Sequence, residues 1–235
     1  MNKTLKTILS ILLALLCVFL VYKIYDGVME PVRFEKDVNA RKKVAIQQLK
    51  DIRDLQVAYK SVNDRFTASF DTLKQFYKNG EMVVLMQIGS KDDSLAWENT
   101  QKITGTREFK KLSKPEQDAK FLDLYRKGEK LVFSISTPIA VKDTLFNNRP
   151  DFCPDSLKYI PFSGKQLVET DAIIKTVSGV QVPLFEARMP WKALLKGMDN
   201  QLRINLDAES RDMNRYEGLQ VGSITAPNNN AGNWE

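Results

Sequence analysis

The hydrophobic pattern changes character along the chain, and its first segment has no polar side at all. Residues 8–22, ILSILLALLCVFLVY, contain no charged side chain, and lysines flank the run on both sides. A helix that crosses a bilayer needs roughly 20 apolar residues, and a snorkelling Lys23 lengthens the run as far as residue 25. The pattern predicts a transmembrane anchor over residues 1–25 that contacts membrane lipid through residues 8–25.

Two alternatives to a permanent anchor stay open. A cleaved signal peptide has an apolar core of similar length, and a soluble protein can bury such a helix. No small-x-small cleavage site follows the run, because residues 21–25 are all bulky. Tyr22 and Tyr25 suit the boundary between lipid and water. These features favour the anchor.

The orientation of the anchor is predicted from its flanking charges. Lys3, Lys6 and the terminal amine favour an N-terminus inside, whereas Lys23, Arg33 and Lys36 beyond the run favour the reverse, so the charges nearly balance. Long domains translocate with little regard to flanking charge. We therefore expect a single pass through the inner (cytoplasmic) membrane, with the C-terminal domain in the periplasm.

The next pattern is a helical stripe that follows a break. Gly27 and Pro31 oppose a continuous helix, so residues 26–33 are predicted to be a linker. From residue 34 onward, apolar residues recur at steps of three, four or seven, the spacing of an amphipathic helix. The stripe consists of Ala45, Leu49, Ile52, Tyr59, Val62 and Phe66.

This spine helix has two possible uses. Its stripe packs against the rest of the domain, or it forms a short homo-oligomeric coiled coil. In the second case Leu49, Ile52 and Tyr59 become a partner interface, together with Trp234 near the end of the chain. Residues 227–235 form a C-terminal tail, which is either loose or docked by burial of Trp234.

Shorter elements are predicted from local signals between residues 69 and 140. Ser69 is a candidate N-cap for a helix that ends before Gly80. An unbroken apolar strand over residues 82–88 predicts burial on both faces. Ser113 and Glu116 have capping-box spacing at the start of another helix. The remaining expectations are a loop over residues 91–100 with Trp97 as a lid, and a strand over residues 131–135 that stops before Pro138.

The last third reads as β-rich. Ser178-Gly179 joins two β-branched runs, residues 172–177 and 180–188, which is typical of a hairpin. Pro183 predicts that the second strand lies at a sheet edge. Further elements are expected as a short helix over residues 190–197 and strands over residues 203–206 and 221–224. The predicted fold is α+β: an N-terminal transmembrane helix, then one domain over residues 34–226 with the amphipathic spine helix packed on a small antiparallel sheet.

Composition narrows the chemistry. The chain has no histidine, which removes Ser-His-Asp and Cys-His catalysis and nearly all zinc sites. Its net charge of +6 comes without a long single-sign block, so nucleic acid is not expected as a partner. Cys17 and Cys153 cannot form a disulfide framework, and Cys153 is expected to be a small buried residue. We expect no cofactor, no metal and no catalytic residue.

Acidic pairs are the one route left to an enzyme. Asp92 with Asp93, and Asp151 with Asp155, are pairs of the kind that two-carboxylate catalysis uses. Such pairs in loops are usually solvated, so a carboxylate-based enzyme is the weaker reading.

The order of elements resembles that of type IV pilins and the pseudopilins of type II secretion. The resemblance lies in the helix AIQQLKDIRDLQVAY of residues 45–59, the polar turn at residues 63–66 and the short helix after it. Residues 1–10 depart from the pilin pattern, since they hold no glycine and no acidic residue for a prepilin peptidase site. The C-terminal half is also similar to single-pass envelope proteins of Bacteroidota.

Together these patterns predict a role in an assembly. We expect a single-pass envelope protein that serves as a structural or accessory subunit of a larger membrane complex. Its partners would be other envelope proteins, with homo-oligomerisation possible. A pseudopilin-like subunit of a secretion or pilus-like machine is the alternative.

Overall fold

A computed structural model describes residues 3–150 and 152–235, and it divides the chain into two compact units. Unit 1 comprises Met1–Lys74 and Cys153–Glu235, and unit 2 comprises Gln75–Phe152. The residues expected to form one domain, 34–226, therefore contain an inserted second unit. The tail, residues 227–235, belongs to unit 1.

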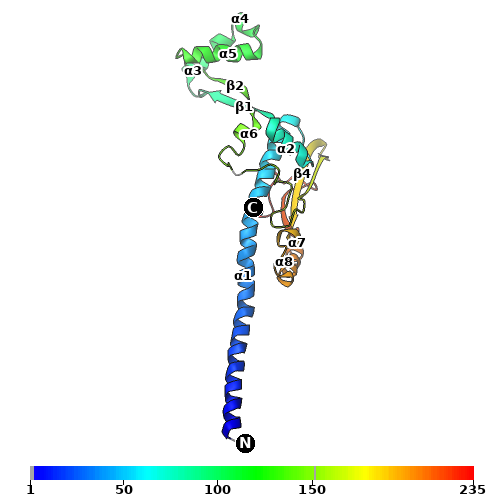
Figure 1. Cartoon of the computed structure of the whole chain (residues 1–235). Helices are drawn as coiled ribbons and strands as arrows, with labels where there is room; N and C mark the ends of the chain where they lie inside the picture. The colour runs from blue at the N-terminus through cyan, green and yellow to red at the C-terminus, as the bar shows by residue number, and fades with distance from the viewer. Residues whose placement is uncertain (1–2, 151) are drawn as a thin grey trace. The chain divides into compact units, whose positions relative to one another are not determined.

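Unit 1 is built on one long helix. Helix α1 runs without a break over Lys3–Asn63, 61 residues, and Figure 1 shows it in blue to cyan. The predicted linker at residues 26–33 is wrong, because Gly27 and Pro31 both lie inside the helix. Pro31 has no N–H to donate to the carbonyl of Gly27. That part of the helix is exposed, so water is able to take the place of the missing donor.

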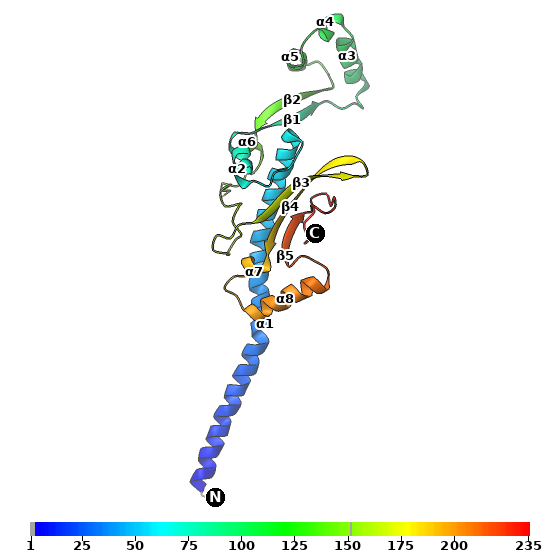
Figure 2. The same cartoon turned by 90° about the vertical axis from the view of Figure 1, so that its right-hand side faces the viewer.

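A three-stranded antiparallel sheet packs on the C-terminal half of α1. The strands are β3 (Glu169–Val177), β4 (Val180–Pro190) and β5 (Gly218–Gly222), in the order β3-β4-β5. Figure 2 shows them alongside α1, which contacts β4 and β5. A mixed α+β fold with a long N-terminal apolar helix and small antiparallel sheets is thus confirmed.

The predicted hairpin between β3 and β4 is confirmed at its turn. Ser178 and Gly179 have φ values of 51° and 83°, as a two-residue turn of primed type requires. The placing of β4 at an edge is wrong, because β4 lies between β3 and β5. Strand β5 pairs only with residues 186–190 of β4. Pro183 therefore lies where β4 still has one open side, and its missing N–H interrupts no pairing there.

The core of unit 1 lies between α1 and one face of this sheet. Alternate residues of β4 and β5 face the helix, because successive strand side chains point to opposite faces. Phe185 is 0% exposed, and its ring centroid lies 4.8 Å from that of Phe66. The other buried members of this face are Ala187, Met189, Leu219 and Val221. Each large apolar side chain buried here contributes about 1.5–3 kcal/mol.

Two helices complete unit 1 between β4 and β5. They are α7 (Trp191–Leu194), which agrees with the short helix predicted there, and α8 (Asn200–Asp212). The strand predicted over residues 203–206 is wrong, since these residues lie within α8. Asp199 caps the helix by accepting the N–H of Leu202 at 2.7 Å, and local capping of this kind favours a helix.

Polar side chains fix α1 to two connecting segments of unit 1. Gln56 is fully buried; it donates to the carbonyl of Thr67 at 2.5 Å and accepts the N–H of Thr67 at 3.2 Å. The Nε2 of Gln48 donates to the carbonyls of Leu157 and Tyr159 at 2.9 and 2.8 Å. The register of α1 against its neighbours is thus set by hydrogen bonds as well as by apolar packing.

Unit 2 consists of a two-stranded ribbon and short helices. Helix α2 (Phe70–Asn79) begins in unit 1, ends in unit 2 and leads into β1 (Glu81–Ile88), which pairs antiparallel with β2 (Phe133–Ala140). Between and after the strands lie α3 (Ser94–Thr104), α4 (Arg107–Lys110), α5 (Lys114–Arg126) and α6 (Val141–Thr144). Its apolar cluster is formed by Phe109, Phe121, Leu131, Phe133 and Ile135.

Several local predictions for the region from α2 to β2 are confirmed and others fail. Ser69 caps α2, and Glu116 accepts the N–H of Ser113 at 2.8 Å as a capping box requires. The loop expected over residues 91–100 is wrong, because Asp93 caps helix α3 there. The strand expected to stop before Pro138 runs past it, since each strand of a two-stranded ribbon has an open edge that tolerates proline.

Strand β1 is not buried on both faces, which corrects a further expectation. Val83 and Leu85, on one face of β1, are 64% and 68% exposed. On the other face of the strand, the apolar cluster of unit 2 packs against Ile88. The continuous apolar run therefore predicts a strand correctly here, but it does not indicate that the strand lies in the centre of a sheet.

Candidate functional site

The first candidate site is the N-terminal half of α1. A window of 18 residues within Ser10–Asn63 has a mean hydropathy of 2.1, and 0% of it is buried. Leu12, Leu13 and Val18 are 58–68% exposed, and they lie on different sides of the helix. By length and composition this helix is able to cross a membrane, although a signal sequence near an N-terminus has the same properties. A helix that is apolar all round needs an apolar environment.

The second candidate is the predicted partner interface, and most of it lies in the core. Leu49 and Ile52 are 0% exposed and Tyr59 is 9% exposed. They pack inside unit 1, so the stripe of the spine helix is occupied by the chain's own sheet. A coiled coil through the same stripe would require α1 to separate from β4 and β5.

The opposite side of this part of α1 carries no second apolar stripe. The side chains there include Lys43, Gln47, Asp54 and Ser61, all exposed. Val57, 46% exposed, is an apolar exception. A polar helix face of this kind is typical of contact with water.

The tail is docked, and this resolves the alternatives for Trp234. The N–H of Gly222 donates to the carbonyl of Ala231 at 3.0 Å, and that of Asn233 to Gln220 at 2.9 Å. Arg53 of α1 pairs with Glu235 at 2.6 Å. Trp234 is partly buried, and its Nε1 atom is fully buried.

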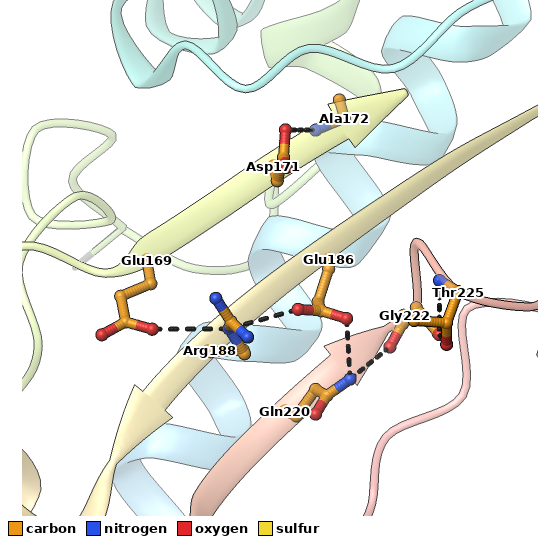
Figure 3. A network of polar contacts seen from close by, with 9 residues as sticks. Glu169, Asp171, Ala172, Glu186, Arg188, Gln220, Gly222 and Thr225 are labelled. Carbon is orange, nitrogen blue, oxygen red and sulfur yellow. Dashed lines mark hydrogen bonds and ion pairs between the residues drawn. The ribbon is translucent and has the colours of Figure 1, made fainter. Parts of the chain in front are cut away.

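A polar network covers the face of the sheet that points away from α1 (Figure 3). Arg188 of β4 lies 3.4 Å from Glu169 of β3 and 3.1 Å from Glu186. Gln220 of β5 donates to the second oxygen of Glu186 at 3.0 Å. Glu186 is only 6% exposed, so its two partners compensate a charge that burial would otherwise disfavour. The network links all three strands.

Tyr216 lies beside this network, with the guanidinium of Arg188 5.5 Å from its ring centroid. Burial, reinforced by the negative charge of Glu169, raises the pKa of Tyr216 to about 12. The phenol therefore stays protonated, and remains a hydrogen-bond donor, to a higher pH than an exposed tyrosine.

The third candidate is a cavity of about 210 Å³ in unit 1. It lies between α1, α8, the start of β5 and the tail. Lys42 and Ile46 of α1 line it, with Trp191 of α7 and Trp234 of the tail. The Nζ atom of Lys42 lies 5.0 Å from the ring centroid of Trp191, within the range of a cation–π interaction.

Of the cavity residues, only Trp234 was singled out from the sequence. Lys42 belongs to a basic run, Arg41-Lys42-Lys43, that reads as a solvated helix face. The residues next to Lys42 in the sequence do not indicate that it lines a cavity, because the cavity is formed by segments that are far apart in the chain. The one sequence feature that pointed to a cavity residue was Trp234, an isolated tryptophan near the polar C-terminal end.

The described members of the acidic pairs make structural contacts. Asp93 is the N-cap of α3, and Asp92 accepts a hydrogen bond from Ser90 at 3.2 Å. Asp155 pairs with Lys74, whereas Asp151 lies outside the described residues. Cys17 and Cys153 are both free and exposed, so the expectation that Cys153 is buried is wrong.

Among residues 3–150 and 152–235, no group of three acidic or cysteine side chains is placed to hold a metal ion. Comparison of the chain with protein-family models, with curated proteins and with solved structures finds no match. The functional argument therefore rests on the geometry of the chain itself.

Proposed function

We propose that this chain is a single-pass membrane-anchored protein of the bacterial envelope that acts as a structural or accessory subunit of a larger membrane assembly. One observation carries the proposal: a single unbroken helix, α1, joins an exposed apolar half to a half buried in unit 1. The first half would lie in the inner membrane, and the folded units would lie on its periplasmic side.

The continuity of α1 supports a mechanical role. A helix rises about 1.5 Å per residue, so the 13 residues from 26 to 38 would separate the end of the anchor from Val38, the first buried residue beyond it, by roughly 20 Å. A continuous helix transmits rotation and displacement from the membrane to the sheet that packs on it. A flexible linker at residues 26–33 would not.

The pseudopilin-like alternative is supported by the same element. A long N-terminal helix with an exposed apolar first half and a second half packed on an antiparallel sheet is the arrangement that the resemblance implies. In such a subunit the apolar half would contact other copies or related subunits within the membrane and the assembly.

Two experiments test the anchor and the assembly separately. Alkaline carbonate washing of native membranes should leave the protein in the pellet, whereas release into the supernatant would overturn the anchor. Cross-linking followed by gentle detergent extraction and mass spectrometry should recover a stoichiometric set of envelope proteins. Recovery of the bait alone and monomeric would overturn the subunit role.

The chemical state of the N-terminus separates the two roles. An intact Met1 on the mature protein favours the permanently anchored accessory subunit. A shortened and methylated N-terminus favours the pseudopilin-like subunit, and mass spectrometry of the N-terminal peptide distinguishes the two.

A further inference from the structure

Most of the described strands have an obstacle to further pairing along their open side. An open strand edge can pair with another chain, and native proteins commonly block it with proline, with charge or with a covering segment. The open side of β4 holds Pro183, and the open edge of β2 holds Pro138. The outer edge of β5 is covered by the tail, since the N–H of Asn233 donates to the carbonyl of Gln220 at 2.9 Å.

Charge blocks the outer edge of β3. The strand carries Glu169, Asp171 and Lys175. The carboxylate of Asp171 already accepts the N–H of Ala172 at 2.8 Å, as Figure 3 shows. A strand added there would displace this contact and meet charged side chains, so the edge of β3 is unsuited to further pairing.

Strand β1 of unit 2 has none of these obstacles. Its residues 82–88, MVVLMQI, contain no charge and no proline. It pairs with β2 alone, so its second edge is open. Val83 and Leu85 are 64% and 68% exposed, and Gln87 is also exposed. An uncharged strand of eight residues with an open edge is suited to the addition of a further strand.

The register shows which backbone groups face this open edge. The N–H of Val141 donates to the carbonyl of Gly80 at 3.0 Å, where the ribbon begins. Hydrogen-bonded and non-hydrogen-bonded pairs alternate along an antiparallel ladder. The even-numbered residues of β1 therefore bond to β2, and the odd-numbered residues direct their N–H and C=O groups outward. Pro138 lies opposite Val83, at an outward position, which agrees with its lack of an N–H.

We infer that β1 pairs antiparallel with β1 of a second copy of this chain. A two-fold axis at Val84 places the outward residues opposite one another and forms about eight backbone hydrogen bonds. In this register Val83 lies opposite Leu85 of the second copy, and Glu81 lies opposite Gln87. Apolar side chains thus meet apolar ones, each carboxylate meets an amide, and no two charges face each other. The inference uses unit 2 alone and does not rest on the membrane anchor.

The same pairing limits the assembly to two copies. It produces a sheet in the order β2-β1-β1-β2, so both of its outer edges are β2. Each outer edge holds Pro138, which has no N–H to donate to a further strand. The result is a closed dimer rather than a fibre. An isolated two-stranded ribbon is marginally stable, so the added strands also stabilise each ribbon.

Disulfide trapping tests the pairing in the full chain. Cys17 and Cys153 are first replaced by serine, and the protein is kept in dodecylmaltoside with micelles in excess. Val84→Cys places the two thiols at the two-fold axis, where opposite Cα atoms lie about 4.5 Å apart, within the range of a disulfide. Mild oxidation should then yield a linked dimer on a non-reducing gel.

Thr137→Cys is the matched control for Val84→Cys. Thr137 lies opposite Val84 in the ribbon, but on β2. In the dimer the two Thr137 positions are three strand spacings apart, about 14 Å. This variant should therefore cross-link only at the rate of random collision.

Charge variants added to Val84→Cys test which edge is used. Leu85→Lys places like charges near each other across the pair and removes two apolar contacts, so the cross-linking rate should fall roughly tenfold. Ser136→Lys adds the same charge to the residue opposite Leu85 on β2 and should leave the rate unchanged. Both positions are exposed, so circular dichroism should show that each variant is folded.

An exchange of side chains tests the register. Gln87→Glu places two carboxylates opposite each other at both ends of the pair and should slow cross-linking several-fold. Adding Glu81→Gln exchanges the two side chains and should restore the rate, since one carboxylate again faces one amide. Failure of this exchange to restore the rate would overturn the register.

Other outcomes would overturn the inference itself. Equal rates for Val84→Cys and Thr137→Cys would mean that the linked dimer arises by random collision. Absence of a linked dimer would mean that the edge of β1 stays open or takes a strand from another protein. Equal slowing by Leu85→Lys and Ser136→Lys would remove the assignment of the edge to β1.

Discussion

The two halves of α1 place the same kinds of side chain in opposite environments. Leu15 in the first half is 66% exposed, whereas Leu49 in the second half is 0% exposed. The backbone does not distinguish them, since both belong to one continuous helix. The difference lies in the residues around each leucine: apolar on every side in the first half, polar on one side in the second.

This contrast shows that the hydrophobic pattern of a helix indicates the kind of surroundings the helix has. A one-sided stripe indicates a helix that has a folded partner, and here the partner is the sheet of β3, β4 and β5. An apolar surface on every side indicates a helix whose surroundings are themselves apolar, as a bilayer is. Substitutions that add a charge to either half should therefore fail in different ways, and the following predictions use that difference.

The largest effect is expected from a charge in the buried half. Ile52→Asp places an unpaired carboxylate in the core of unit 1 and removes an apolar side chain, so the free energy of unfolding should fall by about 4 kcal/mol or more. Urea unfolding followed by circular dichroism measures this. The matched control is Val57→Asp at a position 46% exposed, where a change within about 0.5 kcal/mol is expected. Equal effects at the two positions would contradict the packing of the stripe.

A charge in the exposed half should leave the folded units intact and weaken the proposed membrane attachment. Leu15→Asp would cost about 2.5–3.5 kcal/mol of insertion free energy if residue 15 lies near the bilayer centre. The fraction of protein released by carbonate should rise, while the unfolding midpoint of the folded units stays unchanged. Leu15→Phe is the control and should remain in the pellet. If Leu15→Asp destabilised unit 1 instead, the two halves would not be independent.

The sequence predicted the elements whose signals are local. The turn at Ser178-Gly179 and the capping of α5 by Ser113 and Glu116 depend on residues a few positions apart, and both are as expected. The stripe of α1 was readable as far as Tyr59, because its period is that of the helix. Its last two predicted members differ, since Val62 is 46% exposed and Phe66 lies beyond the end of α1 at Asn63. These features locate the sheet and the buried half of the spine.

Features that depend on residues far apart in the sequence could not be predicted from local patterns. The linker expected around Gly27 and Pro31 is helical, because the residues on both sides propagate the helix through two weak positions. The central place of β4 depends on β5, which pairs with it from beyond α8. The cavity requires α1, α7 and the tail together, so neither Lys42 nor Trp191 carries a local signal for it.

A smaller effect is expected from the buried amide that anchors the second half of α1. Gln56→Ala removes both hydrogen bonds to Thr67 and leaves a backbone donor and acceptor unpaired, so unit 1 should lose about 1–3 kcal/mol. Thermal unfolding should show a lower midpoint. Lys43→Ala, on the exposed side of the same helix, should change the midpoint little. A neutral Gln56→Ala would mean that water replaces the amide without cost.

The smallest effect concerns the tail, which the buried half of α1 holds through a surface ion pair. The hydrogen bond from Arg53 lowers the pKa of Glu235 below its ordinary value of 4.5. A carboxyl group with a lowered pKa in the folded state stabilises that state above pH 4.5 and loses the contribution as the pH falls through the lowered value. Hydrogen exchange at the amide of Asn233 should therefore be slowed by docking near neutral pH and lose part of that protection in acid. Arg53→Gln should remove this pH dependence while Lys43→Gln keeps it, and an unchanged acid response in Arg53→Gln would show that other contacts hold the tail.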